Sequence, residues 1–560
     1  MKLLSTIWNW WVNVVFKDIM HHMKSVDIRK AWQEFWEWTN TPPERKHVWS
    51  DPASLIVKSS EDPTTLFNTA WMQPLVPYLM GKEHPSWSKR VYNIQGCVRT
   101  TDIDEVWDAS HLTFFEMMGN WSLGDYFKKE SVARSYDFLV NVLKLNPNKL
   151  CVSVFAWDKD APRDEETVLL WQKQWIPLHK ISYLWKSDNR RWPAGSTWPC
   201  GPDTEIFYRV WEEEFPPDSS NVWNDEENRM EIWNNVFMAY YKDKTWDFSE
   251  LTEKHVDTWM WFERICMVVQ HQAWIIQWPL KNASVYDTDI FKPILDYLSE
   301  TELSLSAKRI IADHARTALQ LVHEWLIPSN ESRWYILRRI IRRMYFQWTQ
   351  HWWTLEGIEE VLYHIKEHCN TLYDGTISNQ TVLVLYDECK QFAKTLHAWE
   401  KLVNQMIEDR SWDWILSWAD AFMLYDTYGF PLELTQELVA QAWWIINLEW
   451  FDKAMHDAQE RSRAGSEQKF TQSTDWSALI EWLPPTEFIW YMDLEADNVV
   501  ILRDTRVDGK RVVITNKTPF YAESWWQKAD TWIIEMDDGA VIEVINVLNY
   551  WWVYLHFCKE

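Results

Sequence analysis

Glycine is scarce in this sequence, which has 12 glycines in 560 residues, whereas an average protein is about 7% glycine. The chain instead carries 45 tryptophans. Glycine serves wherever the backbone adopts a positive φ angle or approaches a ligand closely, and tryptophan suits neither place. The imbalance predicts that some tryptophans stand at positions where the fold needs glycine.

Paired cysteines and long apolar runs are also missing. The seven cysteines are odd in number, far apart and without a C-x-x-C pair, so neither a disulfide framework nor a zinc ribbon is indicated. We therefore expect a reducing, cytoplasmic location. No stretch approaches the roughly 18 apolar residues of a membrane span, so no membrane partner is expected. The apolar run at residues 3–16 lacks a small-residue cleavage site, and we interpret residues 1–22 as an extension of doubtful status.

Positive charge is in deficit, because the formal net charge is -26. That balance repels a polyanion, so nucleic-acid binding would have to rest on a local basic patch. One such patch is a stripe of five arginines without an intervening carboxylate: Arg333, Arg338, Arg339, Arg342 and Arg343. On a helix this spacing gathers the charges along one side, which favours contact with phosphates.

The patterning along the chain predicts several domains, and 560 residues exceed what one core accommodates. Short β-like runs alternate with helical segments up to about residue 247, which indicates an α+β region. Helical periodicity then dominates to about residue 464, and a polar stretch precedes alternating runs typical of strands. The expected divisions are a domain at 23–248, a helical domain at 249–466, a linker at 467–484 and a β domain at 485–560.

Two dense blocks follow one another between Arg90 and Lys128, reading NIQGCVRTTDIDEV and HLTFFEMMGNWSLGDYFK. They resemble motif 2 of the alanyl-tRNA synthetases, which are class II aminoacyl-tRNA synthetases. The resemblance implies that Arg99 holds the α-phosphate of ATP, where a planar fork of donors suits the pentavalent phosphoryl group. It also implies an aromatic face for adenine, from Phe114 or Phe115, with further ATP contacts from His111, Glu116 and Lys128.

Two later blocks resemble the alanine-binding parts of the same family. In NRMEIWNNVFMAYY, residues 228–241, the asparagine carried over is Asn234. In VDTWMWFERICMVVQ, residues 256–270, Asp257 matches the carboxylate that pairs with the alanine ammonium, and Arg264 matches the arginine at the ATP γ-phosphate. Arg191 stands where the family has a tryptophan that walls the alanine site, so a charge would face a methyl group.

The remaining matches concern tRNA and editing. The resemblance assigns the arginines at 338, 339, 342 and 343 to the acceptor stem, and Asn330 and Asp426 to the G·U pair that identifies alanine tRNA, read in the minor groove. Gln527 matches the start of the editing domain, whose zinc ligands would follow His556. No metal site is expected within this chain, because His364 and His368 are interpreted as a helix-surface coincidence.

Many tryptophans fall on glycines of the family pattern: Trp71, Trp107, Trp157, Trp198, Trp259, Trp261, Trp325, Trp334, Trp525, Trp526 and Trp532. Random mutation would not choose a single replacement. Arg134 and Arg191 fall where the family tends to have tryptophan. We hypothesise that the gene was translated with the wrong codon table, so that tryptophan stands for glycine and some arginines stand for tryptophan.

The resemblance as a whole implies an alanine–tRNA ligase that uses ATP and Mg²⁺ on L-alanine and alanine tRNA. The expected fold is a class II antiparallel sheet flanked by helices, then an all-helical tRNA-recognition domain and a small β-barrel-like domain. The alternative is a non-catalytic synthetase-like tRNA-binding protein, favoured if the tryptophans are real, and an editing deacylase is disfavoured. Zinc is expected only in the missing editing core, and whether a separate chain carries that core stays open.

Overall fold

The computed structural model describes the chain in segments, together with single residues and runs of two or three residues between them. The described segments are 23–38, 46–57, 66–70, 72–157, 161–185, 190–191, 198–211, 228–242, 248–329, 332–349, 354–373, 377–409, 415–426, 499–507, 510–520, 533–535, 541–550 and 553–559. The chain divides into two compact units, residues 1–402 and 403–560. Among the described helices, none combines the length and apolar composition that a membrane crossing requires.

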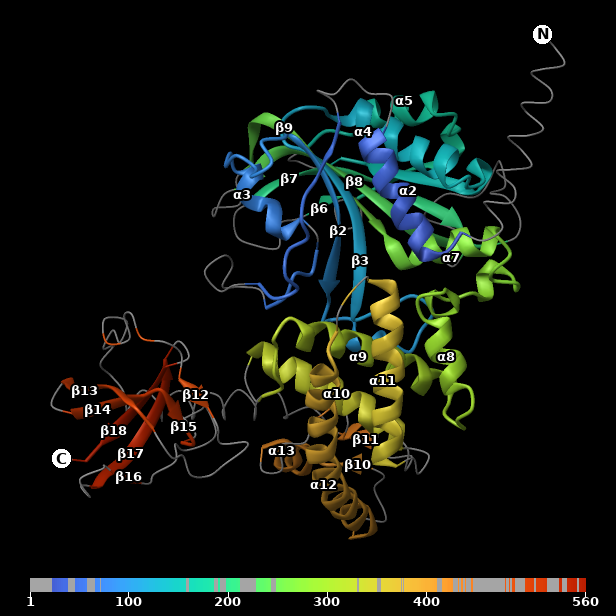
Figure 1. The fold of residues 1–560 in the computed structure, drawn as a ribbon. Coiled ribbons are helices and arrows are strands. Elements are labelled where there is room, and N and C mark those ends of the chain that lie inside the picture. The colour runs from blue at the N-terminus through green and yellow to red at the C-terminus, as the bar shows by residue number, and fades with distance from the viewer. Residues whose placement is uncertain are drawn as a thin grey trace. The chain divides into compact units, whose positions relative to one another are not determined.

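A nine-stranded sheet forms the centre of the first unit (Figure 1). Its order is β1-β2-β3-β9-β8-β7-β4-β5, with β6 paired to β7. The inner strands are antiparallel, whereas the pairs β1–β2 and β4–β5 are parallel. The strands are β1 (Val48–Trp49), β2 (Arg90–Val98), β3 (Phe114–Ser122), β4 (Leu150–Phe155), β5 (Ile181–Leu184), β6 (Arg190–Arg191), β7 (Trp198–Arg209), β8 (Arg229–Lys242) and β9 (Phe248–Trp261). The predicted α+β architecture is confirmed, as a mixed sheet.

One face of this sheet is covered by α2 (Ser25–Trp38) and the π-helix η4 (Asp137–Val142). Trp32 of α2 and Phe138 of η4 both pack on Trp233 of β8, with ring centroids 5.5 and 5.9 Å apart respectively. Two further helices, α4 (Lys128–Tyr136) and α5 (Glu165–Lys173), contact each other beside these elements. Because successive side chains of a strand point to opposite faces, the other face is left for the site.

The sheet continues past the domain boundary expected at residue 248. The strand β9 occupies 248–261 and pairs with both β3 and β8, so it lies in the middle of the sheet. Its first half is exposed or half-buried and charged, which hides the strand pattern, and only residues 255–260 form an unbroken buried run. The helical part therefore begins after β9, at α7 (Phe262–Gln272).

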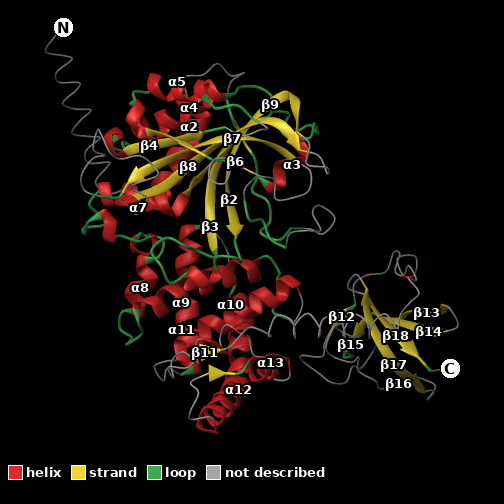
Figure 2. Cartoon of the chain, turned by 180° about the vertical axis from the view of Figure 1, so that it is seen from behind, coloured by secondary structure: helices red, strands yellow, loops and turns green. Residues whose placement is uncertain are grey.

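The helical part of the first unit contains α8 (Lys292–Leu298), α9 (Leu305–His323), α10 (Ser332–Thr349), α11 (Leu355–Leu372) and most of α12 (Asn379–Asp409) (Figure 2). Side-chain caps set two of the starts. The Ser304 hydroxyl accepts from the Ala307 amide before α9, and the Thr354 hydroxyl accepts from the Gly357 amide before α11. Helix α9 packs on α10, α11 and β3, so it joins the helices to the sheet.

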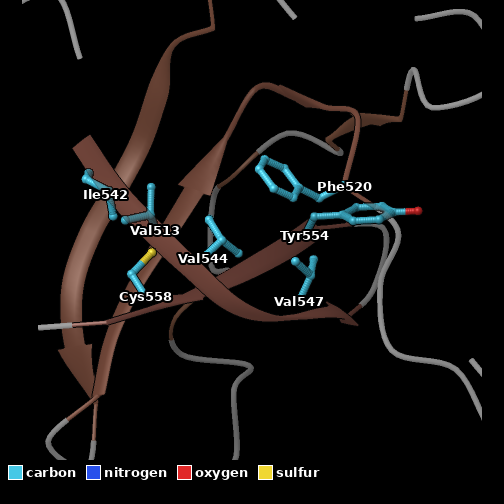
Figure 3. Close-up of a cluster of buried hydrophobic side chains, with 7 residues drawn as sticks. All are labelled: Val513, Phe520, Ile542, Val544, Val547, Tyr554 and Cys558. Carbon is cyan, nitrogen blue, oxygen red and sulfur yellow. The ribbon is translucent and has the colours of Figure 1, made fainter. Parts of the chain in front are cut away.

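The second unit contains α13 (Trp418–Asp426) and a five-stranded antiparallel sheet of order β13-β14-β18-β17-β16. These strands are β13 (Ile501–Val507), β14 (Lys510–Thr515), β16 (Ile533–Glu535), β17 (Val541–Tyr550) and β18 (Val553–Cys558). One buried cluster joins β14, β17 and β18, and Figure 3 shows Phe520 and Tyr554 beside Val547 in it. The alternation in the sequence thus predicted this sheet, while the boundaries expected at 466/467 and 484/485 lie outside the described residues.

Three helices of the first unit end in the same motif, with a tryptophan in the left-handed conformation. Trp175 after α5, Trp274 after α7 and Trp325 after α9 have φ angles of 67°, 60° and 67°. After α9, for example, the Leu326 amide donates to the Leu321 carbonyl at 3.1 Å. That bond defines a Schellman motif, whose left-handed residue is usually glycine because any Cβ is crowded there. The indoles are 88, 69 and 90% exposed, so no packing compensates for that crowding.

Candidate active site

Arg99 follows the last residue of β2 and lies over two aromatic rings. Its guanidinium carbon is 5.1 Å from the ring centroid of Phe115 and 4.9 Å from that of Trp261. The Arg99 Nε donates to the Thr69 carbonyl at 3.1 Å, which fixes the side chain over the rings. The arginine predicted to hold the α-phosphate is thus positioned on the face of the sheet that α2 leaves uncovered.

Phe114 and Glu116 point to the opposite face, which corrects the expectation that they line the ATP site beside Arg99. The Arg316 guanidinium carbon lies 4.6 Å from the Phe114 ring, and Arg29 of α2 forms an ion pair with the Glu116 carboxylate. The reason is strand alternation, because Phe115 between them faces Arg99. Of the two phenylalanines, Phe115 is therefore the one that lies on the same face as Arg99.

Arg264, in the first turn of α7, approaches the same indole as Arg99. Its guanidinium carbon is 4.3 Å from the Trp261 ring centroid, and its Nη1 donates to the Glu231 carbonyl at 3.1 Å. Burial lowers the pKa of this guanidinium. Within the described part of the chain, the buried Arg264 Nε has no hydrogen-bond partner. A buried cationic donor without a partner is suited to bind an anion.

The predicted alanine-binding residues lie on two adjacent strands. Asn234 of β8 lies directly opposite Trp259 of β9, and Asp257 lies two residues before it. The Trp121 indole N–H donates to the Asp257 carboxylate at 2.5 Å. The side chains of Asn234 and Asp257 are both buried, with 1% of each residue exposed. The sheet thus brings the predicted asparagine and carboxylate to one face, beside the tryptophans.

Two carboxylates on β7 hold the amide of Asn234. The Asn234 Nδ2 donates to Asp203 at 3.0 Å and to Glu205 at 3.2 Å. Among the described residues, its buried amide oxygen has no partner. Sequence reasoning missed Asp203 and Glu205, although their spacing of two residues places both carboxylates on one face of a strand.

The tryptophans of β9 occupy the space between these groups. Trp259 and Trp261 have ring centroids 5.4 Å apart, and Trp259 is 4% exposed. The Trp261 indole lies against both Arg99 and Arg264, and its N–H finds no acceptor in the described segments. Glycine at 259 and 261 would remove both indoles and leave a depression bordered by the two guanidinium groups.

His111 lies in the loop between β2 and β3. The nearby positive charge of Arg264 acts to lower the pKa of this histidine. The Asp108 carboxylate accepts from Nδ1 at 2.5 Å and Glu105 lies 3.3 Å from Nε2. The hydrogen bond to Asp108 raises the pKa of His111. Lys128 instead pairs with Asp164, the N-cap of α5, at 2.7 Å. Its proposed ATP contact stays a prediction.

The arginines of α10 do not form one exposed stripe. Arg338 and Arg342 both pair with Glu388 of α12, at 3.2 and 2.9 Å. Arg339 pairs with Asp104 in the β2–β3 loop at 3.1 Å, and Arg343 is 4% exposed. Their carboxylate partners are distant in sequence, which is why the run looked unpaired. Their role in tRNA binding stays a prediction.

Other predicted residues lie at the edge of what the structure describes. Asn330 and Gln527 lie outside the described residues, and Asp426 is the last residue of α13. The backbone of Arg191 pairs with that of Gly201 on β7. His364 stacks on Tyr297, and His368 contacts the Ile290 carbonyl at 2.9 Å.

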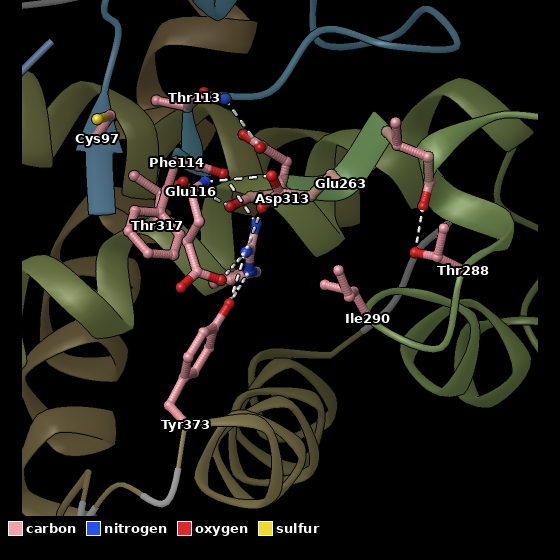
Figure 4. A network of polar contacts seen from close by, with 12 residues as sticks. Cys97, Thr113, Phe114, Glu116, Glu263, Thr288, Ile290, Asp313, Thr317 and Tyr373 are labelled. Carbon is pink, nitrogen blue, oxygen red and sulfur yellow. Dashed lines mark hydrogen bonds and ion pairs between the residues drawn. The ribbon is translucent and has the colours of Figure 1, made fainter. Parts of the chain in front are cut away.

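A buried charge network that the sequence did not reveal joins the sheet to the helices. Figure 4 shows Glu116, Glu263 and Tyr373 converging on one point. The guanidinium at that point is Arg316 of α9, which is fully buried. It donates to Glu263 at 2.8 Å, to the Phe114 carbonyl at 2.8 Å and to the Tyr373 hydroxyl at 2.9 Å. The network fixes the first turn of α7, which also carries Arg264.

A cavity of about 550 Å³ lies elsewhere, between residues 78–89 and residues 251–255 of β9. It contains none of the predicted site residues, and it lies toward the opposite end of β9 from Asp257 and Trp261. No group of three or more metal-ligating side chains gathers within the described segments. The candidate site is therefore the face of β9 that carries Asp257, Trp259 and Trp261.

Comparisons with known proteins agree on one family. A family model described as tRNA synthetases class II (A) matches residues 27–560. An alanine--tRNA ligase of Treponema denticola is 41% identical over 449 residues, which cover 76% of this chain and 71% of that protein. One from Thermotoga petrophila is 36% identical over 558 residues, covering 94% of this chain and 60% of its own length. One from Borrelia hermsii is 38% identical over 462 residues, with 80 and 74% covered.

Proposed function

We propose, since the chain belongs to the class II tRNA synthetases of alanine type, that it activates L-alanine with ATP and transfers alanine to the 3′ end of alanine tRNA. The chain spans 60% of the Thermotoga relative and 71% of the Treponema one. The proposed activity therefore concerns the part of these ligases that aligns with this chain. The resemblance found in the sequence is confirmed, whereas the residue roles remain proposals.

The observation that supports the proposal is the convergence of two arginines and one carboxylate on one sheet face. Arg99 and Arg264 lie within 5 Å of the same ring centroid, that of Trp261, and Asp257 shares its strand. In adenylate formation the alanine carboxylate attacks the α-phosphorus of ATP and pyrophosphate leaves. Arg99 would stabilise the charge that develops on the α-phosphoryl group, and Arg264 would bind the leaving pyrophosphate.

The alanine end of the site would be formed by Asp257 and Asn234. An ionised carboxylate can accept several hydrogen bonds, so Asp257, which accepts from the Trp121 indole, is also suited to accept from an ammonium group. The amide oxygen of Asn234, which has no hydrogen-bond partner among the described residues, is a second acceptor on the same face. No covalent enzyme intermediate is required, and positioning with preorganised charges would supply the rate enhancement.

Mg²⁺ is expected on the ATP phosphates. Such a site takes most of its oxygen ligands from phosphates and water and only one or two carboxylates from the protein. Glu231, which lies 3.7 Å from Arg264 and has a partnerless carboxylate oxygen among the described residues, fits that requirement. The metal would neutralise phosphate charge, while the arginines orient the reacting groups.

The proposal carries a condition on the tryptophans of β9. With indoles at 259 and 261, the space between Arg99 and Arg264 is filled, and the alternative of a synthetase-like tRNA binder without catalysis is favoured. With glycine at these positions, the nucleotide has room. The tryptophans in the left-handed conformation after α5, α7 and α9 favour the hypothesis of glycine in the native protein. All three helices end in a conformation that glycine adopts most readily.

Alanine-dependent exchange of pyrophosphate into ATP tests the ligase proposal, with protein purified from its own cells. We expect exchange, and a loss of roughly 100-fold in kcat for Arg99→Lys and for Arg264→Lys, the size expected for losing one charge-stabilising contact. Lys30→Gln, which changes an exposed ion pair with Glu34, is the matched control and should keep full activity. No exchange above background in the native protein would refute the proposal.

A further inference from the structure

The loop between β2 and β3, residues 99–113, is held by helices rather than by the sheet that it leaves. We define it as the ATP loop, because the proposed function places Arg99 and His111 at the nucleotide. Its backbone carbonyls accept hydrogen bonds from residues of the helical part. Arg309 of α9 donates from Nη1 to the Asp108 carbonyl at 2.8 Å and to the Trp107 carbonyl at 3.2 Å.

Helix α10 holds the loop at a second point. Arg343 donates from Nη1 to the Ile103 carbonyl and, at 3.1 Å, to the imidazole Nε2 of His314. An arginine cannot accept, so Nε2 of His314 accepts and its Nδ1 carries the proton that reaches Asp313 at 2.9 Å. Asp313 also accepts from the Thr113 amide at the end of the loop, at 2.9 Å. A continuous chain of bonds therefore runs from Thr113 through α9 to α10 and back to Ile103.

A third element, the turn η9 (Val285–Asp287), holds the middle of the loop. The Tyr286 hydroxyl donates to the Val106 carbonyl at 3.0 Å, and the Val285 amide donates to the Ala109 carbonyl at 2.9 Å. Backbone carbonyls carry no sequence information, so these contacts fix the position of the loop whatever its side chains are. Several such hydrogen bonds keep the loop in one conformation, as is required when the residues at its ends must bind a ligand in one geometry.

We propose that Arg309 and Arg343 are positioning residues for the ATP site, which hold the ATP loop so that Arg99 and His111 face the nucleotide. This inference rests on the proposed function and deepens it. It assigns Arg343 to the ATP site, whereas the sequence analysis assigned this arginine to the acceptor stem of the tRNA. The side chain of Arg343 is buried and its bonds go to the loop and to His314. The alanine end of the proposed site stands on β8 and β9, whereas both arginines donate to carbonyls of the ATP loop.

The test compares Arg309→Gln and Arg343→Gln in the full chain, with Lys308→Gln as the matched control. Lys308 is the neighbour of Arg309 on α9, and its ammonium group donates to the Thr301 carbonyl at 3.1 Å. We expect the KM for ATP to rise roughly tenfold in both arginine variants, the loss expected for one hydrogen bond to a charged group. The KM for alanine should stay unchanged. A merely structural role would raise both constants together.

Amide hydrogen exchange of residues 99–113 gives a second readout that needs no activity. Loss of either clamp should raise exchange in this loop and leave β8 and β9 protected. Where Arg343→Gln does not fold, Arg343→Lys keeps the charge and one bond and should show a smaller change in both readouts. Unchanged loop exchange in folded variants would overturn the positioning role. Absence of pyrophosphate exchange in the unmutated protein would instead count against the proposed function alone.

Discussion

The guanidinium carbon of Arg264 lies 4.3 Å from the centre of the Trp261 ring. The same ring lies beneath Arg99, so one indole fills the space in which two arginines would hold a triphosphate. An indole buries on the order of 150 to 250 Å². A tryptophan at position 261 would therefore exclude a triphosphate from the space between the two arginines.

The first prediction is that the protein made with tryptophan at every present position shows no alanine activation. Restoring glycine at 259 and 261 alone should not suffice, because tryptophans also occupy left-handed positions elsewhere. Restoring all suspect positions, including the three helix caps, should restore activity. Pyrophosphate exchange and a melting curve on these three proteins measure both effects. Cooperative melting together with alanine activation in the unaltered chain would show that the tryptophans belong to the protein.

The second prediction concerns the helix caps. Trp175→Gly, Trp274→Gly and Trp325→Gly should each stabilise the first unit by roughly 1 kcal/mol, because a side chain at positive φ is strained. Thermal or urea unfolding measures the gain. Trp278→Gly is the control, since Trp278 is also exposed but has no positive φ. It should bring no gain. Peptides of the native protein that span residues 175, 274 and 325 should carry glycine by mass spectrometry.

The sequence predicted the elements of the site better than their orientation. The matched sequence blocks named Arg99, Asp257 and Arg264, and these residues stand on or next to β2 and β9, two strands of one sheet with β3 between them. The choice between Phe114 and Phe115 could not be made, because it depends on which face the first residue of β3 takes. If the alternation of side chains along β3 is shifted by one residue, every side chain of the strand turns to the other face of the sheet.

Partners that are distant in sequence limited the other predictions. The arginines of α10 seemed free because no carboxylate interrupts them, yet Glu388 and Asp104 pair with them from α12 and from the ATP loop. Trp175 and Trp274 escaped notice for a related reason. Their need for glycine comes from a positive φ after a helix, and this conformation becomes visible only when the end of the helix is known.

The third prediction addresses the network around Arg316. Arg316→Met should destabilise the first unit by about 3 to 5 kcal/mol, because it leaves the Glu263 carboxylate buried without its cationic partner. Adding Glu263→Gln should recover part of that loss, so the two changes should not be additive. Chemical unfolding measures both. Arg163→Met, at an exposed ion pair, should leave the midpoint unchanged, and additive losses would contradict the coupling of Arg316 with Glu263.

The last prediction concerns His556 in the β sheet of the second unit. This imidazole is fully buried, contacts the Val513 carbonyl from Nδ1 at 3.0 Å and accepts from the Thr518 hydroxyl at 2.8 Å. Burial lowers its pKa to about 4. A histidine whose pKa is depressed on folding contributes stability above its unfolded value, near 6.5, and loses that contribution as the pH falls toward 4.

Acidification from pH 7 to pH 4 should therefore cost this sheet on the order of 3 kcal/mol through His556 alone. Amide exchange of β14 and β18, measured at several pH values, follows the loss locally. His556→Gln removes the titration and should flatten the part of the pH profile between 6.5 and 4. Carboxylates titrate in the same range, so only the difference between the two proteins counts. Equal slopes in both would show that His556 is not the group that destabilises the sheet in acid.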